Sequence, residues 1–482
     1  MMIEYLYRLR SIDALLGKRE ELERQEIYFS SLDQLNDPME GYKDIFWVGD
    51  RIVWKNLLKH YLLCLERLCV LALLSPELTP LDIPIFITED KLPTESYKET
   101  FRKICSNFFK NDLTEKYIQF LSSAQRPIRR EELIWHLTKL HNLALSCIFL
   151  QYENQKLMKK NAENALFHDL VKDYSINSTP PLALDRVLNN QVASQVSDYL
   201  WVLNYNFISQ LALINKYNSV SNPISPKKEI LFLSFPEHYV LALEKLIYPE
   251  WYVACFLGNV TNPAMWAHYA NGHRGVCLKF KIRRKNETPI IRLNGVKGWQ
   301  SGKISHPVHL DSDFRFYKVN YSKNYPEVDF FRSLGRPSAS ALQSFWYKSE
   351  SGEESACGEG VFKNKEEWHR RYWEEFNSGV ITKLKDWAYE NEYRLVLYGL
   401  ALDYCSPEHR VFKYYFEDLE GIIFGINTTS EEKMRIFKII ENKCIREGRT
   451  DFNFYQAYYS RGTSEISILS LNLVKFRIDK KF

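Results

Sequence analysis

The chain has 482 residues, of which 45% are hydrophobic and 15% aromatic, so its length suits two or three domains with buried cores. Its 64 basic and 60 acidic residues leave a net charge of +4, and this near balance argues against a protein dominated by nucleic-acid binding. Nine cysteines without any C-x-x-C pair argue against a disulfide framework or a zinc ribbon. Because the N-terminus also lacks a signal-peptide pattern, we expect a cytoplasmic protein that does not contact membranes.

The first residues predict a short strand, a helix and a second strand. Ile3–Leu9 has strand character, and the two-residue period places Arg8 and Arg10 on one face. Ser11–Glu26 is expected to be a polar helix, and residues 26–30 the second strand. Either arginine suits bidentate binding of a phosphate, the alternative being a surface cation.

A turn is expected next, at Asn36-Asp37-Pro38. Pro38 fixes its own φ and disfavours helix at Asp37. Asn36 and Asp37 suit the wall of a ligand pocket, the alternative being an ordinary Asx turn.

The middle of the chain predicts a helical insertion within a larger domain. Residues 51–220 repeat apolar positions at helical spacing, and residues 221–249 form a Pro-containing linker. Strand-like runs then return, among them Phe314–Tyr321, and a helix with a capped start at Thr429 follows residues 421–426. Residues 333–361, rich in Ser, Gly and Glu, are expected to be a mobile loop. We therefore expect an α+β fold, with a mixed or antiparallel sheet built from residues 1–50 and 250–482.

The loop 262–275 is unusually rich in reactive and aromatic side chains. His268 suits a general acid or base, and Trp266 and Tyr269 suit stacking on a flat ligand. The alternative is a buried loop whose polar side chains bind backbone groups. A zinc site is not expected, because the five-residue spacing of His268 and His273 fits neither one helix face nor a close ligand pair.

Glu390, Glu392 and Arg394 form the second candidate group. In an extended segment, residues two apart share a face, so the three side chains project together. Two carboxylates and a guanidinium suit recognition of a sugar hydroxyl or stabilisation of a developing cation. The alternative is an exposed strand face on which Arg394 screens the acids.

Four motifs in order resemble the bacterial domain of unknown function 2971 family. They are Ser30-Ser31-Leu32 with Asn36-Asp37-Pro38, Cys255-Phe256 with the stretch from Met265 to Cys277, Trp387 with Glu390-Asn391-Glu392-Tyr393-Arg394-Leu395, and Leu419-Glu420-Gly421-Ile422-Ile423-Phe424-Gly425. The resemblance covers about residues 1–45 and 250–460. The helical insertion lies outside it.

The chain has an arginine on an early strand, an aromatic and polar motif in the middle, and a late Glu-x-Glu that opens a strand. This order is similar to that of ADP-ribosyltransferases, which cleave NAD through an oxocarbenium-like transition state. This resemblance implies Glu392 as the catalytic carboxylate, Glu390 as its partner, and His268 as an aid to proton transfer. It further implies that Arg8 or Arg10 binds phosphate and that Trp266 or Tyr269 stacks on the leaving ring. The middle motif differs from the Ser-Thr-Ser strand of many such enzymes.

Three functions follow as hypotheses. The first is an enzyme that uses NAD as substrate, without a metal, to modify a protein or nucleic-acid acceptor, acting as a toxin or phage-defence effector. The second is a sensor or adaptor that binds a small ligand or a partner protein, with the helical insertion as a route to oligomers. The third is a metal-dependent nuclease built on Asp37, Glu390, Glu392 and His268, which is disfavoured because no lysine is evident beside the acidic pair.

Overall fold

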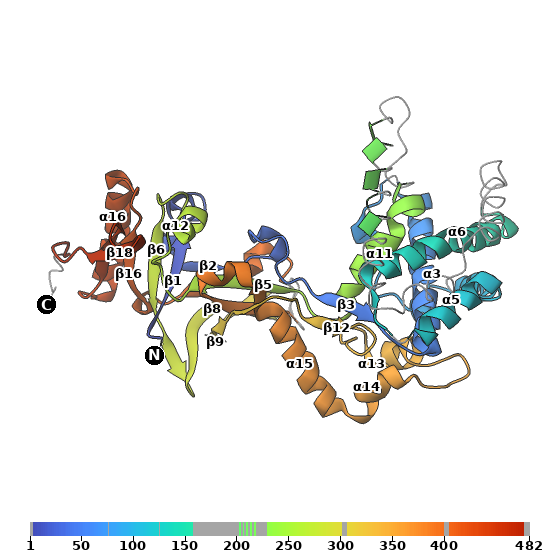
Figure 1. Cartoon of the computed structure of the whole chain (residues 1–482). Coiled ribbons are helices and arrows are strands. Elements are labelled where there is room, and N and C mark those ends of the chain that lie inside the picture. The colour runs from blue at the N-terminus through green and yellow to red at the C-terminus, as the bar shows by residue number, and fades with distance from the viewer. Residues whose placement is uncertain are drawn as a thin grey trace. The chain divides into compact units, whose positions relative to one another are not determined.

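The computed structural model describes residues 3–75, 77–124, 126–157, 229–300, 306–399 and 404–476, with scattered positions between 202 and 217. The chain divides into two compact units (Figure 1). Unit 1 comprises Met1–Tyr42, Pro249–Pro326 and Asn377–Phe482, and unit 2 comprises Lys43–Tyr248 and Glu327–Phe376. Sheets in both units and a helical region confirm the α+β fold class.

Unit 1 is built on an eight-stranded sheet. Its neighbours are antiparallel except β16 and β17, which are parallel. In spatial order the strands are β10 (Tyr317–Lys318), β14 (Glu392–Tyr398), β5 (Trp251–Leu257), β1 (Tyr5–Arg10), β6 (Val276–Lys281), β16 (Leu419–Phe424), β17 (Asn453–Ser460) and β18 (Glu465–Ser470).

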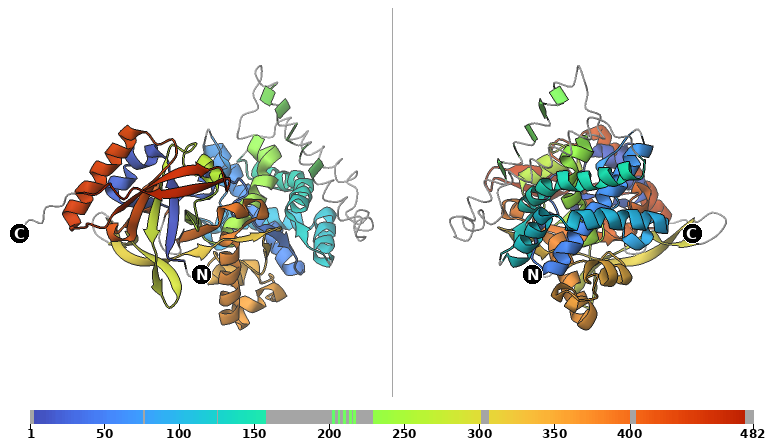
Figure 2. Two further views of the ribbon diagram at one scale, coloured as in Figure 1. Left: turned by 60° about the vertical axis from the view of Figure 1, so that its left-hand side comes forward. Right: turned by 90° about the vertical axis from the view of Figure 1, so that its right-hand side faces the viewer.

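One face of this sheet forms the main core of unit 1. Leu6, Phe256 and Leu395 project from it into an apolar cluster shared with a second sheet and with α16 (Ser430–Glu447). Figure 2 shows α16 lying along the strands. The second sheet contains β2 (Glu26–Tyr28), β15 (Val411–Tyr414), β8 (Thr288–Gln300), β7 (Arg283–Lys285) and β9 (His306–Arg315). The expected cap of α16 is confirmed, because the Thr429 side chain accepts a hydrogen bond from the Glu432 amide.

The opposite face is partly covered by the short helix α12 (Pro263–Tyr269). Met265 and Trp266 of α12 pack on Leu9, Leu257 and residues of β6 and β16. Because strand side chains alternate, each strand contributes to both faces. This second face carries the candidate site.

Two local predictions for unit 1 are wrong. The helix expected at Ser11–Glu26 is two short helices, α1 (Ile12–Leu16) and α2 (Glu21–Arg24), separated at Gly17 and at Glu20, which has φ 49°. The continuous strand expected at residues 314–321 is divided among the end of β9, β10 and β11 (Asn320–Ser322), and β11 pairs in parallel with β13 (Thr382–Leu384).

Unit 2 combines helices with a small sheet of β12 (Glu327–Asp329), β3 (Asp44–Trp47) and β4 (Ile128–Arg129). Its described helices are α3 (Arg51–Leu74), α4 (Glu95–Phe109), α5 (Asp112–Ser123), α6 (Arg130–Asn154), α11 (Phe235–Leu243), α13 (Ala339–Ala341), α14 (Glu359–Lys363) and the first part of α15 (Lys365–Ile381). Helices predicted within residues 158–201 lie outside the described residues.

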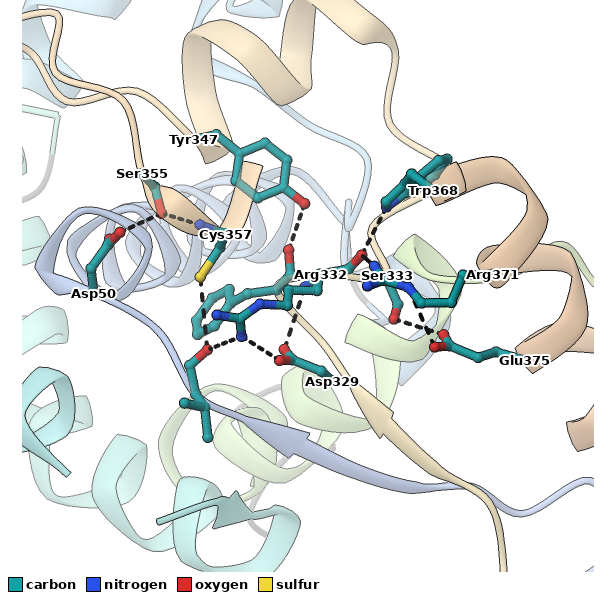
Figure 3. A network of polar contacts seen from close by, with 12 residues as sticks. Asp50, Asp329, Arg332, Ser333, Tyr347, Ser355, Cys357, Trp368, Arg371 and Glu375 are labelled. Carbon is teal, nitrogen blue, oxygen red and sulfur yellow. Dashed lines mark hydrogen bonds and ion pairs between the residues drawn. The ribbon is translucent and has the colours of Figure 1, made fainter. Parts of the chain in front are cut away.

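Polar contacts tie residues 327–376 into unit 2 (Figure 3). Asp50 caps α3 through Oδ1, and its Oδ2 accepts a 2.7 Å hydrogen bond from the Ser355 hydroxyl. Arg332 pairs with Asp329 at 2.6 Å and donates to the Val48 carbonyl. The sequence predicts this segment to lie in the α+β domain, whereas it packs with the helices of unit 2. The mobility expected for residues 333–361 stays a prediction; they include α13 and α14.

Among the described residues, α6 alone is long and apolar enough to cross a membrane by length and composition. Slightly more than half of its apolar stretch is buried inside the protein. Since α6 packs against α4 and α11, this is the pattern of a core helix.

Candidate functional site

Five charged side chains meet on the second face of the large sheet. Three are carboxylates and two are cations, and each side chain is at most 3% exposed. They are Glu40, Lys383, Glu390, Glu392 and Arg394. With every group ionised, this acidic cluster carries one more negative charge than positive.

Glu392 and Arg394 form the rigid part of the acidic cluster. Both lie on β14 and project from the same face, as the alternation predicts. Arg394 Nε and Nη2 donate to the two oxygens of Glu392 at 2.8 and 2.9 Å, and Nη1 donates to the Val380 carbonyl at 2.6 Å. Burial opposes the charge on Glu392, but Arg394 outweighs it and lowers the pKa of Glu392 to about 2. Glu392 is therefore ionised and already neutralised by its neighbour.

Lys383 joins the three carboxylates. Its Nζ lies 2.7 Å from Glu390 Oε2, 3.5 Å from Glu40 Oε2 and 3.6 Å from Glu392 Oε2. Burial alone would lower the pKa of Lys383, but the carboxylates raise it above its usual value. The lysine is thus held as an ammonium ion and does not act as a nucleophile.

Glu390 is the carboxylate without a guanidinium partner. Its Oε1 accepts a 2.6 Å hydrogen bond from the Tyr269 hydroxyl, and its Oε2 accepts one from Lys383. Burial raises the pKa of Glu390, although both partners favour the charged form. Contrary to the extended segment we assumed, Glu390 ends a 3-10 turn, and Asn391 follows with φ 45° before β14 begins.

Glu40 comes from the N-terminal Asn-Asp-Pro turn. Asp37 accepts a hydrogen bond from the Met39 amide and orders this turn, and Glu40 Oε1 lies 2.7 Å from Arg394 Nη2. Burial raises the pKa of Glu40, with Arg394 and Lys383 opposing the shift. Gly41, at φ 71°, allows the chain to leave the turn against the Trp251 ring.

A small pocket opens on the acidic cluster and encloses about 70 Å³. Its lining combines acidic, polar and apolar side chains: Leu9, Leu35, Asn36, Glu40, Cys255, Leu257, Tyr269, Lys383, Glu390 and Glu392. Pockets that enclose a whole drug-sized ligand measure about 300–1,000 Å³. This pocket therefore has room for only a small group, such as one end of a larger ligand.

Arg8 and Arg10 do not join this pocket. They project from the face of β1 opposite Leu9, where Arg8 is buried and donates to the Tyr28 carbonyl. Arg10 pairs with Glu21 through Nε at 2.8 Å and through Nη2. The structure thus separates the expected phosphate-binding arginines from the carboxylates.

The aromatic loop contributes one of its three predicted residues. Tyr269 lines the pocket, whereas Trp266 is fully buried and donates to the Val260 carbonyl. His268 is exposed and is not among the pocket residues. Of the predicted turn residues, Asn36 lines the pocket, whereas Asp37 is buried and is not among the pocket residues.

Sequence reasoning missed Glu40 and Lys383 as site residues, and it marked Cys255 only as part of the family motif. The proline turn two residues before Glu40 is the only local signal for Glu40, and no local signal marks Lys383. The expectation that no lysine lies beside the acidic pair is wrong, because Lys383 contacts both carboxylates.

No group of three or more His, Cys, Asp or Glu residues in the described ranges could hold a metal ion. Within the acidic cluster, the Lys383 ammonium takes the central position among the carboxylates. It supplies the positive charge that a divalent cation would supply in a metal site.

Residues 265–395 match the model of a family described as a protein of unknown function, DUF2971. The resemblance expected from the motifs is thereby confirmed for this segment, which contains Tyr269, Lys383 and the Glu390–Arg394 stretch. No curated protein and no solved structure matches the chain.

Proposed function

We propose that unit 1 cleaves the N-glycosidic bond of NAD, transferring ADP-ribose to water or to an acceptor. The observation that carries the proposal is Glu390, a buried carboxylate at the pocket that is held by Tyr269 and Lys383 but is not neutralised by an arginine. An anionic carboxylate in a water-poor pocket stabilises a positive charge that develops on the ribose.

In this mechanism the bond between ribose C1′ and the nicotinamide nitrogen breaks, and its electron pair leaves with neutral nicotinamide. Glu390 stabilises the resulting oxocarbenium ion. A water or acceptor hydroxyl then attacks C1′ and gives its proton to Glu390. We assign to Glu390 the role that sequence order suggested for Glu392, because Arg394 occupies both Glu392 oxygens.

The test is nicotinamide release from NAD by purified protein, with cell lysate as a source of acceptors and EDTA present. Wild type should turn NAD over. Glu390→Gln should reduce turnover by about 100-fold or more, the usual contribution of a positioned acid–base group. Glu447→Gln, at an exposed position on α16 in the same unit, is the matched control. Unchanged turnover in a folded Glu390→Gln variant would contradict the proposal.

A metal-dependent nuclease is the second candidate. The sequence disfavours it because no lysine is evident beside the acidic pair, but Lys383 lies there in the structure. It requires a divalent ion bound by carboxylates beside Lys383, although no group of three or more metal ligands is found among the described residues. Chelator-sensitive cleavage of DNA or RNA, with no NAD turnover, would support it over the first proposal.

For the cell, we propose a cytoplasmic toxin or phage-defence effector. Expression of wild type should slow growth and lower cellular NAD, because depletion of NAD stops metabolism. Expression of Glu390→Gln at equal protein level should do neither. Equal growth of the two strains would count against the toxic role.

A further inference from the structure

One cross-strand row links the acidic pocket to Lys279 on the same sheet face. Glu392 pairs with Leu257, Leu257 with Tyr7, Tyr7 with Lys279, and Lys279 with Gly421. Directly paired residues project from one face, so the Glu392 and Lys279 side chains point to the same side. They are three strand spacings apart, or about 14 Å at about 4.8 Å per strand.

Lys279 stands between two tyrosine rings. Its Nζ lies 3.9 Å from the Tyr5 ring centroid and 5.2 Å from that of Tyr455. Lys279 forms no ion pair with a carboxylate among the described residues, and the three side chains are half-buried. Burial and the nearby carboxylates of Glu420 and Glu4 raise the pKa of Tyr5, so two acidic side chains also lie near this ring. The lysine is therefore positioned by aromatic contacts while its charge remains available to an anion.

Gly421, which pairs with Lys279, allows the Tyr455 ring to pack closely over the strand. A Cβ atom at this position would lie 2.5 Å from the Asn453 carbonyl oxygen and 3.0 Å from Tyr455 Cε2. The Tyr455 ring therefore lies across a residue without a side chain. The result is an aromatic platform, formed by Tyr5, Lys279 and Tyr455, on the face that carries the pocket.

We infer that the aromatic platform binds the phosphate-bearing half of a nucleotide, with Lys279 on the phosphates and Tyr5 or Tyr455 stacked on the base. The inference rests on the proposed function, since it names the second half of that ligand. Lys279 supplies the cation for the phosphates, because Arg8 and Arg10 lie on the opposite face of the sheet. Binding on the aromatic platform also accounts for a pocket that has room only for the reacting end.

The test measures binding of ADP-ribose, which lacks the reacting bond, to the full chain by calorimetry. Lys279→Met should weaken binding about tenfold or more, as expected when a charged hydrogen bond is lost. Lys279→Arg should retain most of the affinity. Lys438→Met, at an exposed position on α16, removes the same charge elsewhere and should leave the affinity for ADP-ribose unchanged.

The tyrosine is tested separately. Tyr455→Phe should bind ADP-ribose normally and Tyr455→Ala more weakly, because stacking needs the ring but not the hydroxyl.

Equal affinities of wild type and Lys279→Met, or no binding by wild type at millimolar ADP-ribose, would overturn the inference. The two proposals fail in different ways. ADP-ribose binding that depends on Lys279, without NAD turnover, would support the platform and contradict the chemistry. NAD turnover with a KM that Lys279→Met leaves unchanged would support the chemistry and contradict the platform.

Discussion

Glu390 and Glu392 are two residues apart, yet their surroundings give them different properties. Arg394 satisfies both oxygens of Glu392 and keeps the carboxylate ionised, whereas burial raises the pKa of Glu390. Neighbouring titratable groups whose environments move their pKa values apart are typical of acid–base sites. Glu392 and Arg394 thus serve as a fixed support, and Glu390 is the group able to exchange a proton.

This difference predicts unequal effects of the two Glu→Gln substitutions on the free energy of unfolding. Glu392→Gln leaves Arg394 buried with a weakened partner and should lower the free energy of unfolding by about 3 kcal/mol. Glu390→Gln removes the excess negative charge and should change it by less than about 1 kcal/mol. Urea unfolding at pH 7 measures both values. Equal losses would show that Glu392 is not the structural member of the pair.

At the scale of elements, two buried histidines join the helices of unit 2. His60 on α3 bonds to the Tyr239 hydroxyl of α11 at 2.9 Å and to the Ile85 carbonyl. His141 on α6 bonds to the Tyr61 hydroxyl of α3 and to the Leu231 carbonyl, both at 2.7 Å. Burial lowers the pKa of His60 to about 3 and that of His141 to about 4, so both are neutral in the folded unit.

Unit 2 should therefore lose stability in acid. Below about pH 6.5 these histidines bind protons in the unfolded chain but stay neutral in the folded unit. The free energy of unfolding therefore falls as the pH drops toward 4. At pH 5 the loss is about 2 kcal/mol for each histidine. Urea unfolding at several pH values, followed by tryptophan fluorescence, measures this loss of unfolding free energy. His60→Gln, which removes one titrating group, should flatten the pH dependence, and an identical slope in that variant would contradict the assignment.

Elements also show what the sequence could predict. The two-residue alternation correctly placed Glu392 and Arg394 on one face, because that pattern is local. It placed Arg8 and Arg10 together too, but only the packing of β1 against the second sheet decides which face they occupy. Glu40 and Lys383 reach the acidic cluster from distant segments through tertiary contacts, so no local pattern could identify them. The single helix expected at residues 11–26 failed because Gly17 interrupts it.

At the scale of the whole molecule, the candidate site lies in one of the two units. Unit 1 holds the acidic pocket and the aromatic platform on one sheet face, and all the residues in the proposed mechanism belong to it. Unit 2 is formed by the helical insertion together with residues 327–376, which pass back into it through β12. The family match crosses this second segment, so the residues it covers come from both units.

The most direct test of the account is a crystal structure of the Glu390→Gln variant grown with NAD. We predict that ribose C1′ lies beside the residue 390 carboxamide and the diphosphate beside Lys279 Nζ, on one face of the eight-stranded sheet. A nucleotide bound elsewhere, or a pocket without ligand at saturating NAD, would contradict it.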